Sequence, residues 1–259
     1  MRNLGSRGLA AACLLSPLLS FWPRAPAAAA VDAGGSLALT SDDVYRAISQ
    51  TCGHPAIQAD LHVRERGASN WAAFAGAWGS AGLGGNPCGR AKELDAYLGY
   101  SLVLTPDLSA TLTYTRYAFP GGDYGNPHLD GQRYDYDQFA MSWDIAERLY
   151  LTLAWTPDAL QYERYEGRFR SEQNRGALAY GAEWRQPLVS WLSLTAAVGY
   201  DRMADPFGTG YGFWSLGLTH AAGPLELDFG YFRTSARAVH LFGPDSAGGR
   251  VSATVLWRF

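Results

Sequence analysis

The chain has 259 residues, 47% of them apolar, and a mean hydropathy of −0.14. This length allows one barrel or two small globular domains. Beyond the first thirty residues no apolar run reaches the roughly eighteen residues of a membrane-spanning helix, which excludes a helical membrane bundle. Thirty Gly, nine Trp, fifteen Tyr, eleven Phe and a single lysine, Lys92, favour strands and turns. We therefore expect an all-β fold.

Residues 1–30 have the composition of a secretory signal peptide. Arg2 and Arg7 give it a positive start, residues 8–19 are mostly apolar, and alanines at 27–30 offer small-residue cleavage sites. Without this segment the chain keeps 18 basic and 24 acidic residues, a net charge of −6. That charge argues against a nucleic-acid partner. The sequence predicts an exported chain whose mature domain is residues 31–259.

Twelve segments of about nine to twelve residues alternate, wholly or in part, between apolar and polar positions. In residues 108–115 and 93–102 every second residue is apolar, and the last nine residues, 251–259, repeat the pattern and end on an aromatic. Each segment is long enough to cross a bilayer as a tilted strand. The predicted strands are 36–46, 55–66, 70–80, 92–104, 107–118, 133–144, 148–156, 175–186, 190–201, 210–221, 224–234 and 249–259.

The alternation alone fits a soluble β-sandwich equally well, but the connections between the segments favour a barrel. Short and long connections strictly take turns, as they do in outer-membrane barrels with tight periplasmic turns and longer external loops. The sequence therefore predicts a transmembrane antiparallel β-barrel of about twelve strands in the bacterial outer membrane. The long connections are 47–54, 81–91, 119–132, 157–174, 202–209 and 235–248.

Aromatic residues cluster near the strand ends, where the two interfaces of a membrane would lie. One group lies near the short turns: Trp71, Trp143, Trp184, Trp191, Trp257 and Phe259. A second group lies near the long loops: Trp78, Tyr117, Trp155, Tyr200, Tyr211 and Tyr231. We expect two aromatic girdles, although aromatic residues are common in any strand.

Polar residues at alternate positions are expected to face the interior and to line a pore. They are Arg46, Gln58, Asp60, His62, Arg64, Glu93, Asp95, Glu183, Arg185, Glu226, Asp228 and Arg258. The set mixes both signs, so it could pair into a plug or line a narrow water-filled channel. Gly, Ser and Thr at many inward positions leave room and favour a channel. We expect passive diffusion of small hydrophilic solutes or ions, and a non-conducting structural or adhesive barrel is the alternative.

A barrel enzyme is a third possibility, and the sequence favours it least. No Gly-x-Ser-x-Gly motif is present, and the five histidines are scattered over different strands and loops. No His-x-x-x-His spacing or Asp-rich loop indicates a metal site, and we expect no cofactor. The loop 157–174 interleaves aromatics and arginines, which suits either a ligand surface or two extended strand ends.

Cys52 and Cys88 are the two cysteines outside the predicted signal peptide. An exported chain meets an oxidising compartment, where a cysteine pair persists as a disulfide. Both cysteines fall in long connections on the same side of the predicted barrel, so we expect them to be bonded to each other. The alternative is two free thiols too far apart to pair.

Residues 40–58, with Thr-Ser-Asp-Asp-Val-Tyr-Arg-Ala-Ile-Ser-Gln-Thr followed by Pro-Ala-Ile-Gln, resemble the TorF family of proteobacterial proteins described as porins. Residues 77–80, 93–100 and 116–121 follow in the family's order. Asp43 replaces an aromatic and Ala47 replaces a glycine of the family pattern. The resemblance implies transport across the outer membrane. It also implies contact with membrane lipid and lipopolysaccharide.

Resemblance to outer-membrane barrels in general implies a role for the two terminal aromatics, Trp257 and Phe259. In such barrels the aromatic carboxy-terminus is an assembly signal that the barrel-assembly machinery recognises. Because the last strand must pair with the first to close the sheet, Phe259 is expected at the seam.

Overall fold

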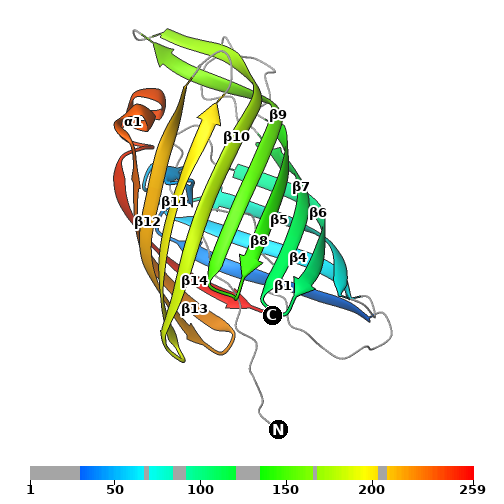
Figure 1. Cartoon of the computed structure of the whole chain (residues 1–259). Coiled ribbons are helices and arrows are strands. Elements are labelled where there is room, and N and C mark those ends of the chain that lie inside the picture. Colours follow the sequence, from blue (N-terminus) through cyan, green and yellow to red (C-terminus); the bar gives the residue numbers. More distant parts are fainter. Residues whose placement is uncertain (1–29, 67–69, 84–91, 121–134, 166–167, 204–208) are drawn as a thin grey trace.

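A computed structural model describes residues 30–66, 70–83, 92–120, 135–165, 168–203 and 209–259. In this part of the chain twelve antiparallel strands close into one barrel, in the order β1-β14-β13-β12-β11-β10-β9-β8-β7-β6-β5-β4 (Figure 1). The predicted twelve-stranded barrel is confirmed. The predicted signal peptide lies outside the described residues, except for Ala30, which begins the first strand.

The wall consists of strands of 10 to 22 residues. They are β1 (Ala30–Thr40), β4 (Ala56–Arg66), β5 (Trp71–Gly82), β6 (Lys92–Thr105), β7 (Leu108–Ala118), β8 (Tyr136–Ile145), β9 (Leu149–Tyr165), β10 (Arg168–Val189), β11 (Leu192–Met203), β12 (Thr209–Ala222), β13 (Leu225–Thr234) and β14 (Gly249–Arg258). Three short elements, β2 (Val44–Tyr45), β3 (Ile48–Ser49) and the helix α1 (Ala236–Phe242), are not part of the wall.

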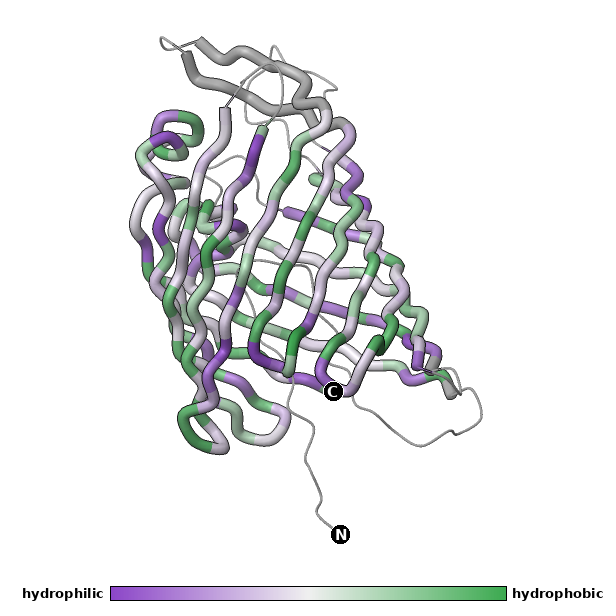
Figure 2. Tube along the Cα trace, in the orientation of Figure 1, coloured by the Kyte–Doolittle hydropathy of each residue, from purple (hydrophilic) through white to green (hydrophobic). Residues whose placement is uncertain are grey.

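Side chains alternate between an apolar outer face and a mostly polar lumen along the strands. On β4, Leu61 and Val63 are 62% and 50% exposed, whereas Asp60, which precedes Leu61, is 5% exposed. The hydropathy of each strand accordingly changes from residue to residue (Figure 2). An outer surface of exposed Leu, Val, Phe and Trp is suited to hydrocarbon, and the closed sheet leaves no unpaired strand edge in it.

The barrel closes where β1 meets β14. Gly35 and Phe259 exchange two backbone hydrogen bonds, each 3.0 Å from N to O. The Phe259 ring covers Gly35, because a Cβ added to this glycine would lie 2.8 Å from the ring's Cζ. Phe259 therefore lies at the seam, as expected from the sequence.

One predicted strand and one predicted loop differ from the structure. The predicted strand 36–46 is displaced: β1 ends at Thr40, and the chain then turns into the lumen instead of continuing along the wall. The predicted loop 157–174 is largely strand, because β9 and β10 extend to Tyr165 and from Arg168 and pair with each other (Figure 1). Of the two alternatives expected for this segment, two extended strand ends describe it, and a ligand-binding loop does not.

The aromatic girdle at the short-turn end is present on the outer face, with Trp184, Trp191, Trp257 and Phe259 42–55% exposed. At the other end the prediction is partly wrong. Tyr117 and Tyr211 are 3% and 4% exposed, and Trp78 shares the inward parity of Ser80 on β5. These three rings lie inside the barrel, because they occupy strand positions whose side chains point into the lumen. No helix in the described residues is long and apolar enough to cross a membrane.

Candidate functional site

Residues 41–55, which connect β1 to β4, fold into the lumen near its long-loop end. The segment contains the two-residue strands β2 and β3, which pair with each other as a small hairpin. At its turn Arg46 and Ala47 have φ values of 48° and 61°, the left-handed pair required by a tight two-residue hairpin turn. We call residues 41–51 the lumen hairpin. Nearly all of its side chains are less than 9% exposed, so it occupies the interior.

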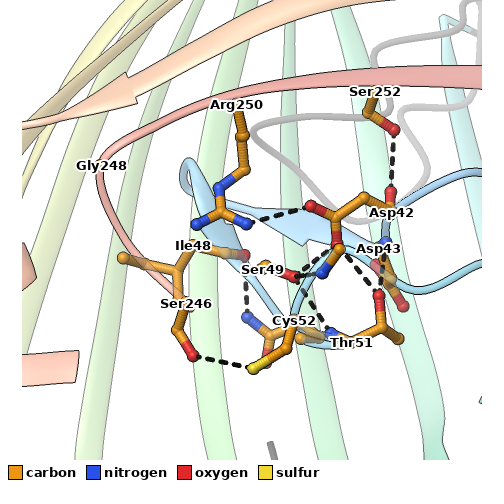
Figure 3. A network of polar contacts seen from close by, with 12 residues as sticks. Asp42, Asp43, Ile48, Ser49, Thr51, Cys52, Ser246, Gly248, Arg250 and Ser252 are labelled. Atoms are coloured by element: carbon orange, nitrogen blue, oxygen red, sulfur yellow. Dashed lines mark hydrogen bonds and ion pairs between the residues drawn. The ribbon is translucent and has the colours of Figure 1, made fainter. Parts of the chain in front are cut away.

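One end of the lumen hairpin is fixed to β14 through Asp42 (Figure 3). Arg250 donates to the Asp42 carboxylate over 3.0 Å, and Ser252 donates to its backbone carbonyl over 2.8 Å. Within the hairpin, the Ser49 and Thr51 hydroxyls donate to the same carboxylate. Asp42 thus joins the two arms of the hairpin to the wall.

The turn of the hairpin is fixed to the opposite side of the lumen by Arg46. Its Nη1 donates to Asp201 Oδ2 on β11 over 2.9 Å, and its Nη2 lies 3.4 Å from Gln138 Oε1 on β8. The Arg46 and Asp201 side chains are only 9% and 13% exposed. This buried ion pair holds the turn of the hairpin firmly against β11, because moving the turn away would leave a buried charge without its partner.

A third attachment joins the hairpin to β5. Ser80 donates to Asp43 Oδ2 over 2.5 Å. Burial raises the pKa of the Asp43 carboxyl, an effect opposed by its hydrogen bonds with Ser80 and Gln58. Asp43 is therefore protonated over a wider pH range than an exposed aspartate.

The hairpin's apolar side packs against one part of the wall. Val44, Ala47 and Ile48 join a buried cluster with residues of β11, β12, β13 and α1, including Phe213 and Leu241. The helix α1 and its loop lie at the same end of the barrel (Figure 1). Apolar packing thus holds the side of the hairpin that carries Val44 and Ile48. Hydrogen bonds and ion pairs hold Asp42, Asp43 and the turn at Arg46.

The lumen hairpin does not fill the interior. A cavity of about 50 Å³ lies between it and the β10–β14 wall, and its lining includes Asp42, Glu183 and Asp228. A second cavity of about 20 Å³ lies beside Arg46 and also reaches Glu183. The hairpin thus leaves open space beside it in the lumen.

The predicted pore residues all lie on the lumen side. Arg46 differs from the prediction in its element, since it belongs to the hairpin and not to a wall strand. The other eleven lie at inward register positions of their strands: Gln58, Asp60, His62 and Arg64 on β4, Glu93 and Asp95 on β6, Glu183 and Arg185 on β10, Glu226 and Asp228 on β13, and Arg258 on β14.

The structure brings these residues together in two groups. On the β4–β6 wall, Asp60 accepts from the Tyr97 hydroxyl and contacts His62 Nδ1, both over 2.6 Å. On the opposite wall, Arg185 lies 3.6 Å from Glu183, and Arg258 lies 3.5 Å from Glu226. The lumen therefore carries charged groups on both of these walls.

Asp228 belongs to the second wall, where it accepts from Thr219 over 2.6 Å. The predicted pore set left out several residues that hold the lumen hairpin in place: Asp42, Asp43, Asp201 and Arg250. Asp201 and Arg250 were detectable, because both occupy inward positions of predicted strands. Asp42 was detectable in the same way, because it shares the parity of Arg46 in the predicted strand 36–46. Asp43 has the opposite parity, and nothing in the sequence indicates that the chain turns inward after Thr40.

Cys52 is disulfide-bonded, and its sulfur lies 3.6 Å from the Ser246 hydroxyl in the α1 loop (Figure 3). Cys88 lies outside the described residues, so the pairing of Cys52 with Cys88 stays a prediction. In the described part of the chain no group of three or more His, Cys, Asp or Glu residues is arranged to hold a metal ion.

Residues 24–255 match the sequence profile of a family described as "Bacterial protein of unknown function (Gcw_chp)". No curated protein matches the chain. A solved structure described as "Unveiling the Mechanism Behind the in-meso Crystallization of Membrane Proteins" is 7% identical. The match covers 88% of this chain and 83% of the chain in that structure, with a TM-score of 0.58.

Two further similar structures have lower scores. The NanC porin is 9% identical over 87% of this chain and 98% of its own, with a TM-score of 0.46. OmpF of Salmonella typhi, in complex with daunomycin, is 8% identical over 88% of this chain and 97% of the OmpF chain, with a TM-score of 0.48. At these identities the first structure shows the fold alone, and the other two are too distant to bear on function.

Proposed function

This chain belongs to the Gcw_chp family of bacterial proteins, and we propose that it is an outer-membrane channel for passive diffusion of small hydrophilic solutes or ions. The observation that carries the proposal is the lumen itself. It is lined by charged and hydroxyl side chains and retains a cavity of about 50 Å³ beside the hairpin. A polar, hollow interior within an apolar outer surface is what a water-filled path requires.

The proposed location is the outer membrane, with the short turns in the periplasm and the lumen hairpin toward the outside. A closed barrel satisfies every wall backbone group in hydrocarbon, and the first thirty residues have the composition of an export signal. In this setting the apolar face contacts membrane lipid and lipopolysaccharide. Trp257 and Phe259 form the signal read by the barrel-assembly machinery.

The resemblance to the TorF family is part of this proposal and supports a porin. In the proposed mechanism the lumen hairpin sets the size limit, because it is the element that narrows the interior. Arg46, Asp43 and the wall carboxylates determine which solutes pass. Nothing in this mechanism needs a catalytic group, so we propose a channel and not an enzyme.

A plugged, non-conducting barrel is the second candidate, and one observation favours it. The hairpin is attached to the lumen wall at three places, through Asp42 to Arg250, Asp43 to Ser80 and Arg46 to Asp201. A loop held this firmly could close the path instead of narrowing it. The barrel would then have a structural or adhesive role.

Electrical recording distinguishes the two candidates. Purified protein, refolded in detergent and checked for the heat-dependent gel mobility of a folded barrel, is added to a planar bilayer. We expect discrete conductance steps of uniform size. A folded barrel that inserts but gives no steps would overturn the channel and support the plugged barrel.

A further inference from the structure

We infer that the channel prefers cations and selects them in the cavity beneath the lumen hairpin, through the carboxylates of Glu183 and Asp228. This inference rests on the proposed channel function and names the class of solute. We call this cavity of about 50 Å³ the carboxylate chamber. It lies between Asp42 of the hairpin and Glu183 of β10.

The lining of the carboxylate chamber is suited to a positive charge. Its polar groups are carboxylates, hydroxyls and one side-chain amide, and no Arg, Lys or His is among the described residues that line it. The carboxylates are Asp42, Glu183 and Asp228, and the hydroxyls are Thr40, Thr195, Ser215, Thr219, Ser252 and Thr254. Such a lining offers many oxygen acceptors and a negative charge to anything that enters.

Two of the chamber's carboxylates lack a hydrogen-bond partner for one oxygen. Glu183 is 5% exposed, and its Oε1 is buried with no hydrogen-bond donor in the described residues. Arg185 Nη2 lies 3.6 Å from that oxygen, beyond hydrogen-bonding distance. Asp228 Oδ2 is likewise buried without a donor. Buried acceptors without donors are costly, and a cation in the chamber would satisfy both.

Four of the lumen's arginines take part in ion pairs. Arg46 pairs with Asp201, Arg250 with Asp42, Arg185 with Glu183 and Arg258 with Glu226. In the described chain no Arg or Lys lies within ion-pair distance of Asp228, Asp95 or Asp43, so Asp228 keeps an uncompensated carboxylate in the chamber. Clefts lined by one sign of charge concentrate counter-ions of the opposite sign.

The test is the reversal potential of the full-length folded protein in a planar bilayer under a tenfold KCl gradient. We expect wild type to favour K⁺ over Cl⁻ by at least about five-fold. The variant carrying Glu183→Gln and Asp228→Asn should lose at least about two-thirds of this preference, because both acceptors become neutral. The single variant Asp228→Asn should fall between them.

The matched control carries the same chemical changes on the outer face. Glu65→Gln on β4 and Asp137→Asn on β8 remove two carboxylates that point away from the lumen. The control should keep the wild-type reversal potential. A wild-type channel without cation preference, or a chamber variant that retains the full preference, would overturn the inference.

A second measurement decides the matter if the folded barrel gives no conductance, an outcome that refutes the channel itself. Equilibrium dialysis of radiolabelled methylammonium against folded protein in detergent reports whether the chamber takes a cation. Retention by wild type and by the outer-face control, with loss in the chamber variant, supports the site. Equal retention by all three, or none by wild type, contradicts it.

Discussion

Arg46, at the turn of a hairpin inside the barrel, donates to the carboxylate of Asp201 on β11 over 2.9 Å. The two residues are 155 positions apart in the chain. Their contact joins a loop segment inside the lumen to the wall across the interior. The space left in the lumen therefore depends on an ion pair as well as on the number of strands.

The first prediction concerns this ion pair. Arg46→Ala should leave Asp201 buried without its partner and weaken docking of the hairpin by about 3 kcal/mol, the usual cost of breaking a buried pair. Single-channel recording should show a larger and noisier conductance than wild type. Arg202→Ala is the matched control, because Arg202 is the exposed neighbour of Asp201 on the same strand. An unchanged conductance in Arg46→Ala would contradict the role of the pair.

The second prediction is a disulfide between Cys52 and Cys88. It would close a loop of about 37 residues and, in the disputed chain-entropy account, stabilise the fold by about 3–4 kcal/mol. Mass mapping of unreduced protein should yield one peptide pair linked through these residues. Freely alkylated Cys88 in the folded protein would refute the pairing. Because Cys52 follows the lumen hairpin directly, Cys52→Ser should also increase conductance noise.

The third prediction concerns the seam. Removing Phe259 deletes both hydrogen bonds that it exchanges with Gly35 and the ring that covers this glycine. We expect several-fold less folded protein in the outer membrane, measured by immunoblotting of membrane fractions. Phe259→Tyr keeps the backbone pairing and an aromatic ring, so its level should match wild type. Equal levels of the truncated and complete chains would show that the terminal residue is dispensable.

The fourth prediction is a pH dependence from Asp43. Burial raises its pKa in the folded state above the ordinary value of 3.8, so the folded protein keeps a proton that the unfolded chain has released. The folded state binds more protons across that window, and stability therefore falls as pH rises from 3.8 through the raised pKa.

Asp43→Asn should remove this contribution, since an asparagine does not titrate. The measurement is the free energy of unfolding in urea at a series of pH values, compared between wild type and the variant. The difference between them should change with pH in this window. Asp137→Asn, on the outer face, is the control. A constant difference between wild type and Asp43→Asn would contradict the raised pKa.

The barrel was predictable because each wall strand carries its own signal. Alternation places Leu61 and Val63 outward and Asp60 inward from the sequence alone, since successive side chains of a strand point to opposite faces. Alternating connection lengths then indicated the closed antiparallel order. The identity of the inward residues followed from the same periodicity.

The position of the lumen hairpin was not predictable, because it depends on contacts between distant segments. Residues 44–49 form two strands of two residues each, too short for periodicity to reveal. Their position is set by partners such as Asp201 and Arg250, which lie far along the chain. Burial of Asp42 and Asp43 also runs against the usual exposure of aspartate. Only the folded structure shows which polar groups offset the cost of burying these two carboxylates.

The central claim is that the lumen hairpin narrows an open channel. The most direct test compares single-channel conductance of wild type with that of a variant in which residues 43–50 are replaced by a short Gly-Ser linker. Both proteins must first show the gel mobility of a folded barrel. We predict uniform steps from wild type and steps at least about two-fold larger from the variant, because removing the hairpin widens the water-filled path. If the folded wild-type barrel gives no conductance steps, whatever the variant does, the open channel is contradicted. If the two proteins give steps of equal size, the hairpin does not narrow the channel.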